Sequence, residues 1–275
     1  MLTIAQAISR VNGVAEEKVE QMSVLDQISK PKPRPLAVTI IGEAGLGKTS
    51  LGACFPKPIF IRAEDGLKSI IHSAMPDAFP VLKSVEDLWP QLWALAKEDH
   101  QYETVVIDTV STLDTLFTDW VVETDSNKPK TIKQALGGYG AGYSMVASQH
   151  RRLRKGCEYL LDRGMNVVFL SHASTETVNP PDGNPYTKYT MRMSDNSMQP
   201  YVDNVDLVGF LRLETFTKGD GDVKKAISTG DRQLVCHAMA SNVSKNRFDI
   251  TEPIEVKLGV NPLAAYLIQN KEETK

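Results

Sequence analysis

The sequence is poor in cysteine, in net positive charge and in long apolar runs, and each shortage excludes a class of protein. The three cysteines among 275 residues show neither paired nor metal-ligand spacing, which argues against a disulfide framework or a zinc site. The 34 acidic residues outnumber the 31 basic ones, so no overall positive field would hold nucleic acid. No run approaches the ~18 apolar residues of a membrane helix. We therefore expect a cytoplasmic protein with no membrane contact.

The N-terminal region differs in pattern from the rest of the chain. Residues 2–29 carry apolar residues at helical spacing, and Gly13 divides them into two short helices. Every second residue of 30–35 is proline, which makes this segment extended and moderately stiff. We predict a helical arm with a proline-rich linker at 1–35, a main domain at 36–270 and a tail at 271–275. The arm either packs on its own core or docks on a neighbour.

The main domain alternates short buried Val/Ile runs with helical patterns, which predicts a mostly parallel sheet covered on both faces. Beyond residue 200 the pattern is β, and we expect antiparallel strands added to one edge of the sheet. The expected parallel strands are 36–41, 58–62, 104–107 and 166–170, the helices 48–54, 85–97 and 144–163, and the later strands 205–215, 223–227 and 234–239.

A glycine-rich phosphate-binding motif follows the first strand. Residues 42–49 read GEAGLGKT, which satisfies G-x-x-x-x-G-K-[ST] between a strand and a helix. The glycines let backbone N–H groups turn toward an anion, and the helix N-terminus adds its dipole. Lys48 would bridge the β- and γ-phosphates of ATP, and the Thr49 hydroxyl would bind Mg²⁺. The predicted nucleotide contacts are Gly42, Glu43, Ala44, Gly45, Leu46, Gly47, Lys48, Thr49 and Ser50.

Two further strands end in carboxylates. The apolar run 105–107 ends at Asp108, which would hold Mg²⁺ through water, opposite Thr49. The strand 58–62 is followed by Glu64 and Asp65, and we expect Glu64 to polarise the attacking water, with Asp65 as a turn acid. A GTPase is disfavoured, because its N-K-x-D motif would need aspartate at Lys130.

The order of these parts resembles the RecA-like ATPases, and a RecA-like P-loop NTPase core is the fold that the resemblance implies. His172 ends the strand run VVFLS at the position of the polar sensor, where RecA itself carries Gln. Residues 244–248, SKNRF, are similar to the K-N-R-F segment of the RadA branch. The resemblance implies that Lys245 and Arg247 reach the γ-phosphate of an ATP bound between subunits of a homo-oligomer, a ring or a filament.

Within this superfamily the chain looks most like the phage Sak-type single-strand-annealing proteins. The shared features over residues 36–250 are the P-loop, the A-E-D-G strand end, V-V-I-D-T, a Gly-Tyr-Gly segment and V-V-F-L-S-H. The resemblance implies a phage protein acting in the bacterial cytoplasm. Its expected activity is ATP-dependent annealing or strand exchange on single-stranded DNA, and a single-strand-binding protein is a candidate partner.

A basic segment after Asp108 is a candidate DNA-binding region. Residues 128–155 carry seven Lys and Arg side chains and no acidic one, although the whole chain is negative. Glycines and two tyrosines lie between these charges, and single-strand binders combine basic grooves with stacking aromatics. A surface loop followed by a solvated helix face is the alternative. The predicted DNA contacts here are Lys128, Lys130, Lys133, Tyr139, Tyr143, Arg151, Arg152 and Arg154.

A second candidate lies at 174–200, which is long for a simple connection. The turn signal PPDGNP at 180–185 separates flanks that could pair as a projecting hairpin, residues 175–178 with 186–192. Lys188 and Arg192 alternate there with two tyrosines, and both are predicted DNA contacts.

Two other functions fit the P-loop. One is a nucleotide-gated adaptor or loader, in which ATP switches protein contacts and DNA binding is incidental. The other is a P-loop kinase, which is disfavoured because the sequence has no convincing Arg-rich lid.

Overall fold

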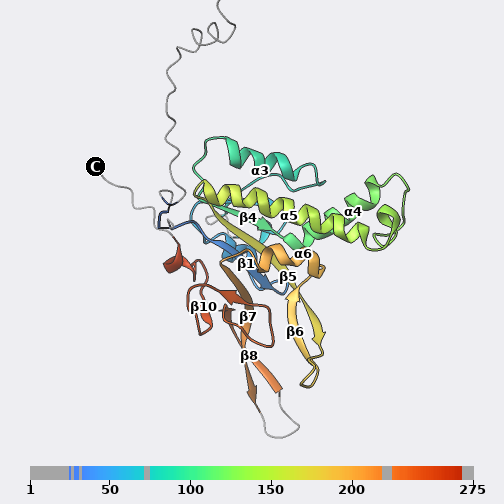
Figure 1. Cartoon of the computed structure of the whole chain (residues 1–275). Helices are drawn as coiled ribbons and strands as arrows, with labels where there is room; N and C mark the ends of the chain where they lie inside the picture. Colours follow the sequence, from blue (N-terminus) through green and yellow to red (C-terminus); the bar gives the residue numbers. More distant parts are fainter. Residues whose placement is uncertain (1–24, 26–27, 31–32, 71–74, 219–224, 268–275) are drawn as a thin grey trace, which may run out of the picture. The chain divides into compact units, whose positions relative to one another are not determined.

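The computed structural model describes residues 25, 28–30, 33–70, 75–218 and 225–267 (Figure 1). The chain divides into two units, Met1–Pro33 and Arg34–Lys275, and the account below concerns the second. The tail predicted at 271–275 and almost all of the predicted helical arm lie outside the described residues.

The described residues of the second unit form a ten-stranded sheet. Its order is β10-β8-β7-β1-β5-β4-β2-β3, with β6 beside β5 and β9 beside β7. The strands are β1 (Ala37–Gly42), β2 (Pro58–Arg62), β3 (Asp77–Ala78), β4 (Thr104–Asp108), β5 (Asn166–Val178), β6 (Tyr186–Met191), β7 (Leu207–Lys218), β8 (Lys225–Val235), β9 (Lys245–Asn246) and β10 (Ile254–Val256).

The pairing confirms the predicted α/β architecture, a mostly parallel sheet with antiparallel strands at the C-terminal edge. Strand β1 pairs in parallel with both β5 and β7, and β4, β2 and β3 continue the parallel part. Strands β8 and β10 extend the other edge antiparallel. Two expectations were wrong. Strand β7, predicted as an added antiparallel strand, is parallel to β1 and belongs to the core. The two strands predicted at 223–227 and 234–239 are a single strand, β8.

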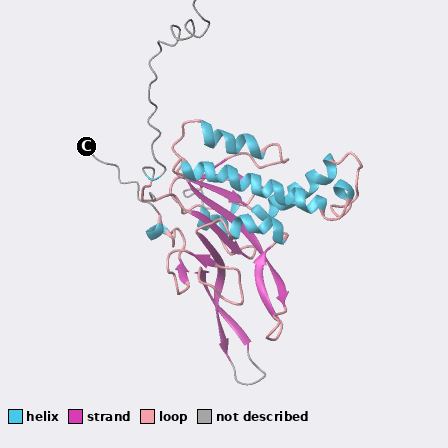
Figure 2. Ribbon diagram, viewed as in Figure 1, coloured by secondary structure: helices cyan, strands magenta, loops and turns pink. Residues whose placement is uncertain are grey.

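Helices cover both faces of the sheet. Figure 2 shows α3, α4 and α5 above it. Alternate residues of the buried strands belong to two separate apolar clusters, which is the pattern of a sheet buried on both sides. One cluster contains α3, α4, α5 and α6, and the other contains α2 and the C-terminal segment. The helices are α2 (Lys48–Gly52), α3 (Leu88–Lys97), α4 (Val110–Thr124), α5 (Ala141–Asp162) and α6 (Asp195–Val202), with 3₁₀ turns η2 (Leu67–Ser69), η4 (Ala135–Gly137) and η5 (Ala264–Tyr266).

Strand β1 is shorter than its two neighbours, and this difference shapes the carboxyl edge of the sheet. The register aligns Gly42 with His172 of β5 and with Leu211 of β7. Strand β5 continues to Val178 and pairs with β6, which confirms the predicted hairpin, while β7 continues to Lys218 beside β8. Both hairpins therefore project beyond the end of β1, in the same direction in Figure 1.

A buried polar network joins three helices on the main helical face. His150 of α5 is fully buried, with Nδ1 2.7 Å from the Tyr201 hydroxyl of α6 and Nε2 3.0 Å from Asp114 Oδ1 of α4. Burial lowers the pKa of His150. Because each ring nitrogen has a partner, the histidine is satisfied inside an apolar layer.

We predict that Tyr201→Phe lowers the free energy of unfolding by about 1–3 kcal/mol, since it leaves a buried histidine nitrogen without a partner. Urea denaturation would measure the change. The control is Tyr102→Phe, whose hydroxyl donates to Asp77 at the surface; its loss should stay below about 1 kcal/mol. Equal losses would contradict the assigned importance of the network.

Candidate active site

The P-loop lies at the carboxyl end of β1, between the two projecting hairpins. Gly45 and Gly47 have φ values of 80° and 87°, a region that side chains with a Cβ rarely adopt. The Lys48 ammonium donates to the carbonyls of Gly42 and Glu43, at 2.9 and 2.8 Å. Burial lowers the pKa of Lys48. The lysine is thus held against the loop, at the place where the β- and γ-phosphates of a nucleotide would lie.

Thr49 and Asp108 meet beside the loop, as predicted for a magnesium site. The Thr49 hydroxyl donates to Asp108 Oδ2 at 2.8 Å. Asp108 Oδ1 is buried and has no hydrogen-bond partner among the described residues. Burial raises the pKa of Asp108 to about 6. An orphaned carboxylate oxygen beside a hydroxyl fits Mg²⁺, which takes hard oxygen ligands and is bound by one or two carboxylates together with substrate phosphates.

Gly66 lies against these two ligands. A Cβ at this position would lie 3.2 Å from Thr49 Oγ1 and 3.3 Å from Asp108 Oδ2. The described residues contain no group of three or more His, Cys, Asp or Glu side chains suited to a metal. The cation would therefore depend on Thr49, Asp108 and the nucleotide itself, with Gly66 leaving the space.

Glu64 lies near the same edge, held by two side chains. His172 Nε2 is 3.2 Å from Glu64 Oε1, and the Thr112 hydroxyl donates to Glu64 Oε2 at 3.0 Å. The hydrogen bond from His172 is the largest cause of a lowered Glu64 pKa. Glu64 is therefore an oriented carboxylate, as a residue that polarises water needs to be. The contact of His172 with Glu64 also places the predicted sensor beside the predicted base.

Thr112 was missed by the sequence analysis. It lies in the first turn of α4, where the Thr109 side chain accepts from the Thr112 backbone N–H as N-cap. Asp108 and this helix start are consecutive in the chain, so the strand end and the first turn of α4 enter the site together. The V-V-I-D-T run contained the signal, since a threonine directly before a helix is a favoured N-cap.

Two arginines from distant parts of the chain add positive charge near Lys48. Arg232 of β8 donates from Nη1 to the Leu46 carbonyl at 3.4 Å, and a Cβ on Gly47 would lie 2.5 Å from the same nitrogen. The backbone N–H of Arg192 donates to the His172 carbonyl, and the charge of Arg192 contributes, after burial, to the lowered pKa of Lys48. Arg192, predicted as a DNA contact, therefore lies near the phosphate site, and Arg232 was missed.

The predicted finger residues lie at the opposite end of the strands. Lys245 and the adjacent Asn246 pair with the first residues of β7, level with the start of β1. The Lys245 ammonium donates to the carbonyls of Val202 and Asp203, and Arg247 forms an ion pair with Asp206 at 3.1 Å. Within one chain these side chains are far from the P-loop end of the sheet.

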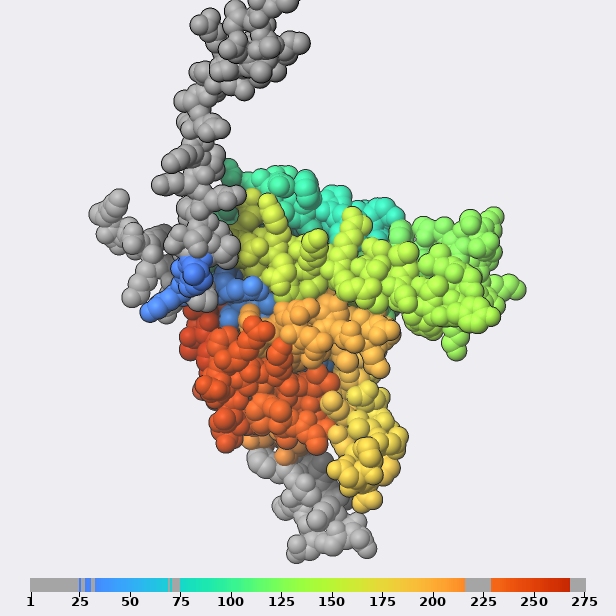
Figure 3. Space-filling view, in the orientation of Figure 1, coloured from blue at the N-terminus to red at the C-terminus, as the bar shows by residue number. Residues whose placement is uncertain are grey.

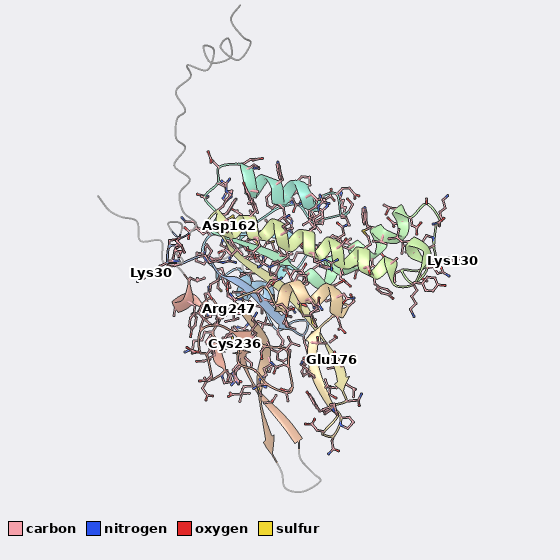
Figure 4. All side chains as sticks on the ribbon, viewed as in Figure 1. Lys30, Lys130, Asp162, Glu176, Cys236 and Arg247 are labelled. Carbon is pink, nitrogen blue, oxygen red and sulfur yellow. The ribbon has the colours of Figure 1, made fainter. Side chains whose placement is uncertain are left out.

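The first part of the basic segment belongs to a lobe, residues 125–143, that runs from the end of α4 into the first turn of α5, with Lys130 at its far end in Figure 4. The side chains of Lys128, Lys130 and Lys133 are exposed, Tyr139 is fully exposed and Tyr143 is partly so. From Leu136 to Gly140 all five residues have positive φ, including Leu136 at 56° and Tyr139 at 50°. Non-glycine residues adopt this conformation at an energetic cost, and such strain clusters at functional sites.

The three arginines of α5 differ in their surroundings. Arg151 and Arg152 are exposed, whereas Arg154 is only 3% exposed. Arg154 pairs with Glu158 at 2.7 Å and donates to the carbonyl of Asn204. The prediction of Arg154 as a DNA contact was wrong, because its position on α5 turns its side chain toward the sheet and α6 and away from solvent. On the β5–β6 hairpin, Lys188 lies opposite Glu176, so its charge is partly offset.

Comparison with known proteins agrees with this geometry. The model of a family described as "AAA domain" matches residues 34–248. The chain belongs to the AAA domain family. With the P-loop, Thr49 and Asp108 in place, this identifies a nucleotide-binding ATPase domain of the P-loop class.

Two further proteins are similar to this chain. The chain is 27% identical over 176 residues to the SPbeta prophage-derived uncharacterized protein YorG of Bacillus subtilis (strain 168). That match covers 63% of this chain and 50% of YorG, so this AAA domain chain spans about half the length of the curated relative. A solved KaiC-like protein from Pyrococcus horikoshii OT3 matches with a TM-score of 0.46 and 12% identity, over 83% of this chain and 88% of its own. Among the described residues no helix is long and apolar enough to cross a membrane.

We predict that Gly66→Ala raises the Mg²⁺ concentration needed for half-maximal ATP hydrolysis several-fold. The backbone of Gly66 is right-handed, with φ of −80°, so alanine fits the chain and the effect is steric crowding of Thr49 and Asp108. A magnesium titration of the hydrolysis rate would measure it. ATP affinity in EDTA serves as the internal control and should not change. An unchanged magnesium requirement would remove Gly66 from the metal site.

We predict that Glu64→Gln lowers ATP turnover at least ~100-fold while ATP binding is retained, because the amide cannot accept the proton of water. Steady-state hydrolysis and nucleotide binding would be measured together. The matched control is Asp65→Asn, since Asp65 is the adjacent carboxylate and pairs with Arg62 and Lys68 instead. Wild-type turnover in Glu64→Gln would exclude Glu64 as the base.

Proposed function

We propose that this protein is an ATP-dependent, single-stranded-DNA-binding recombination protein that promotes annealing or strand exchange, of the phage Sak-type group. ATP with Mg²⁺ binds at the P-loop and is hydrolysed at sites between subunits of a homo-oligomer. When bound, Mg²⁺ neutralises phosphate charge. This chain's own residues hold the phosphates, orient water at Glu64 and present a basic surface to DNA.

The observation that carries the proposal is the lobe at 125–143. It has exposed lysines, and Tyr139 is fully exposed in a strained backbone conformation. From Lys128 into α5 as far as Lys155 the sequence has no acidic residue. Asp125 orders the base of the lobe, because its carboxylate accepts from the backbone N–H groups of Asn127 and Leu136. Exposed cations with a presented aromatic ring suit a single strand, whose phosphates and base faces are both accessible.

Helix α4 connects this lobe to the nucleotide site. Its first turn carries Thr112, which binds Glu64, and its last residue is Thr124, directly before Asp125. The helix has 15 residues and is therefore ~22 Å long. A change at the γ-phosphate that moves Glu64 or Thr112 would reach the lobe through one rigid element, which supports DNA-stimulated hydrolysis.

The location of Lys245 and Arg247 supports assembly between subunits. They lie at the amino ends of the strands, whereas the P-loop lies at the carboxyl ends, so a neighbour that brings them to the P-loop would do so head to tail. Heterologous contacts of this kind generate rings or filaments. The Arg247 side chain is 60% exposed, so its pairing with Asp206 is weak and exchangeable with a phosphate.

The test of the proposed function is ATP hydrolysis with and without a long oligo-dT, with particle size followed by light scattering. Stimulation together with assembly is expected. Hydrolysis that is indifferent to DNA, without assembly, would favour the adaptor, and phosphate transfer to a small acceptor would identify a kinase.

We predict that the triple change Lys128→Ala, Lys130→Ala and Lys133→Ala weakens oligo-dT binding and reduces the slope of log affinity against log salt by about 2. Each phosphate contact on a single strand contributes ~0.7 to this slope. Fluorescence anisotropy at several salt concentrations would measure both quantities. Lys83→Ala, also an exposed lysine, is the control and should behave as wild type. A wild-type slope in the triple variant would exclude the lobe as a DNA contact.

A further inference from the structure

A groove between α3 and α5 has no part in the nucleotide site. It encloses about 390 Å³, and its lining includes Trp89, Trp93 and Lys97 from α3 and Arg152, Lys155 and Tyr159 from α5. The two helices lie side by side on the same face of the molecule in Figures 1 and 3. Gly156 lines the groove as well, and a Cβ at this position would make only ordinary van der Waals contact, 3.9 Å from a Leu92 methyl group.

Large aromatic rings are exposed in this groove. Trp93 is 65% exposed and Tyr159 is 49% exposed. Two of the chain's three tryptophans, Trp89 and Trp93, line it. An exposed aromatic cluster of this kind marks a surface that binds a ligand or a partner.

Cations lie over these rings. Lys97 Nζ is 5.0 Å from the Trp93 ring centroid and 5.3 Å from that of Tyr159, and Arg152 Cζ is 3.9 Å from the Trp89 centroid. No carboxylate lines the groove, and among the described residues none forms an ion pair with Lys97, Arg152 or Lys155. The charge of the groove is therefore positive and not neutralised.

We infer that this groove binds single-stranded DNA, with bases stacked on Trp93 and Tyr159 and the backbone phosphates at Arg152 and Lys155. The inference rests on the proposed function and adds a second contact surface to the lobe. Lys97 is a point charge on a flexible stem, so it leaves the space between the two rings when a base enters and then pairs with a phosphate. Aromatic platforms with cations are how proteins bind single strands without sequence preference.

The groove is continuous with the lobe through α5. That helix begins at Ala141, two residues after Tyr139, carries Tyr143 in its first turn, and carries Arg151 and Arg152 about three turns after its start. A polyanion that lies on the lobe and follows α5 would meet the groove next. An apolar protein partner would instead leave three cations unpaired at the contact, so the charge favours nucleic acid.

The test compares variants that lack the aromatic rings at positions 93 and 159 with variants that keep an aromatic ring there. Labelled oligo-dT is titrated with full-length wild type, with Trp93→Ala combined with Tyr159→Ala, and with Trp93→Phe combined with Tyr159→Phe. Loss of both rings should weaken binding about tenfold or more, while the phenylalanine variant should stay within about threefold of wild type, since stacking tolerates the kind of ring. The salt slope should not change, because no charge is removed. Both alanine changes are at exposed positions, and thermal unfolding would verify the fold.

An abasic strand of the same length sharpens the assignment. Without bases there is nothing to stack, so wild type and the alanine variant should bind this strand equally. An equal tenfold loss on the abasic strand would overturn base stacking.

The remaining outcomes separate this inference from the proposed function. Wild type that fails to bind oligo-dT would overturn both. Wild type that binds and depends on Lys128, Lys130 and Lys133, with the alanine variant unaffected, would overturn the groove alone. Loss of self-association in the alanine variant at unchanged DNA affinity would assign the groove to a second copy of the chain and would also overturn the inference.

Discussion

The parallel pairing of β1 between β5 and β7 is the constraint on which the site depends. It places the P-loop, Asp108 and His172 at one edge of the sheet, because the carboxyl ends of parallel strands share an edge. Glu64, which follows β2, reaches the same edge because β2 pairs with β4 in register. Asp108 and His172 belong to the buried strands β4 and β5, and the P-loop and Glu64 follow the ends of β1 and β2.

The charges at this edge are incompletely paired without a nucleotide. Burial lowers the pKa of Lys48 and raises that of Asp108, so each group is less stable in its charged form than it would be in water. A nucleotide phosphate and a divalent cation would supply the missing partners of opposite sign. Glu64 is different, since His172 and Thr112 already stabilise its ionised form. Nucleotide binding is thus favoured beside a carboxylate, Glu64, that is already held in its ionised form and is proposed to polarise water.

The local part of this site was predictable from sequence, and the long-range part was not. The glycine loop, Asp108 and Glu64 are each encoded by a strand run and the residues directly after it. Helix α4 was missed because its sequence is rich in Val and Thr, which favour strands, and α6 because Pro200 lies inside it. The β5–β6 hairpin was found because its turn signal is strong.

Arg232 shows the limit most clearly. Almost the whole domain separates Arg232 from Gly47 in the sequence. Arg232 reaches the P-loop only because β8 pairs with β7, which pairs with β1. No local pattern contains that information. The prediction of Arg154 as a DNA contact was wrong for the converse reason. A run of basic residues on a helix indicates positive charge, but packing decides which of these side chains points inward. Periodicity at this point could have separated Arg154 from Arg151 and Arg152, because the buried Leu153 and Cys157 flank it on the same face.

The arrangement of the strand ends restricts where partners can bind. The proposed neighbour contacts use the carboxyl edge, where two hairpins flank the P-loop, and the amino edge, where Lys245 and Arg247 lie. Assembly of that kind leaves the helical face, with α3, α5 and the lobe, outside the subunit contacts. Lysines and arginines without carboxylate partners gather on this face although the chain as a whole carries a net charge of −3. A negatively charged strand that lies along α5 would therefore meet these cations and leave both strand edges free for nucleotide and neighbour.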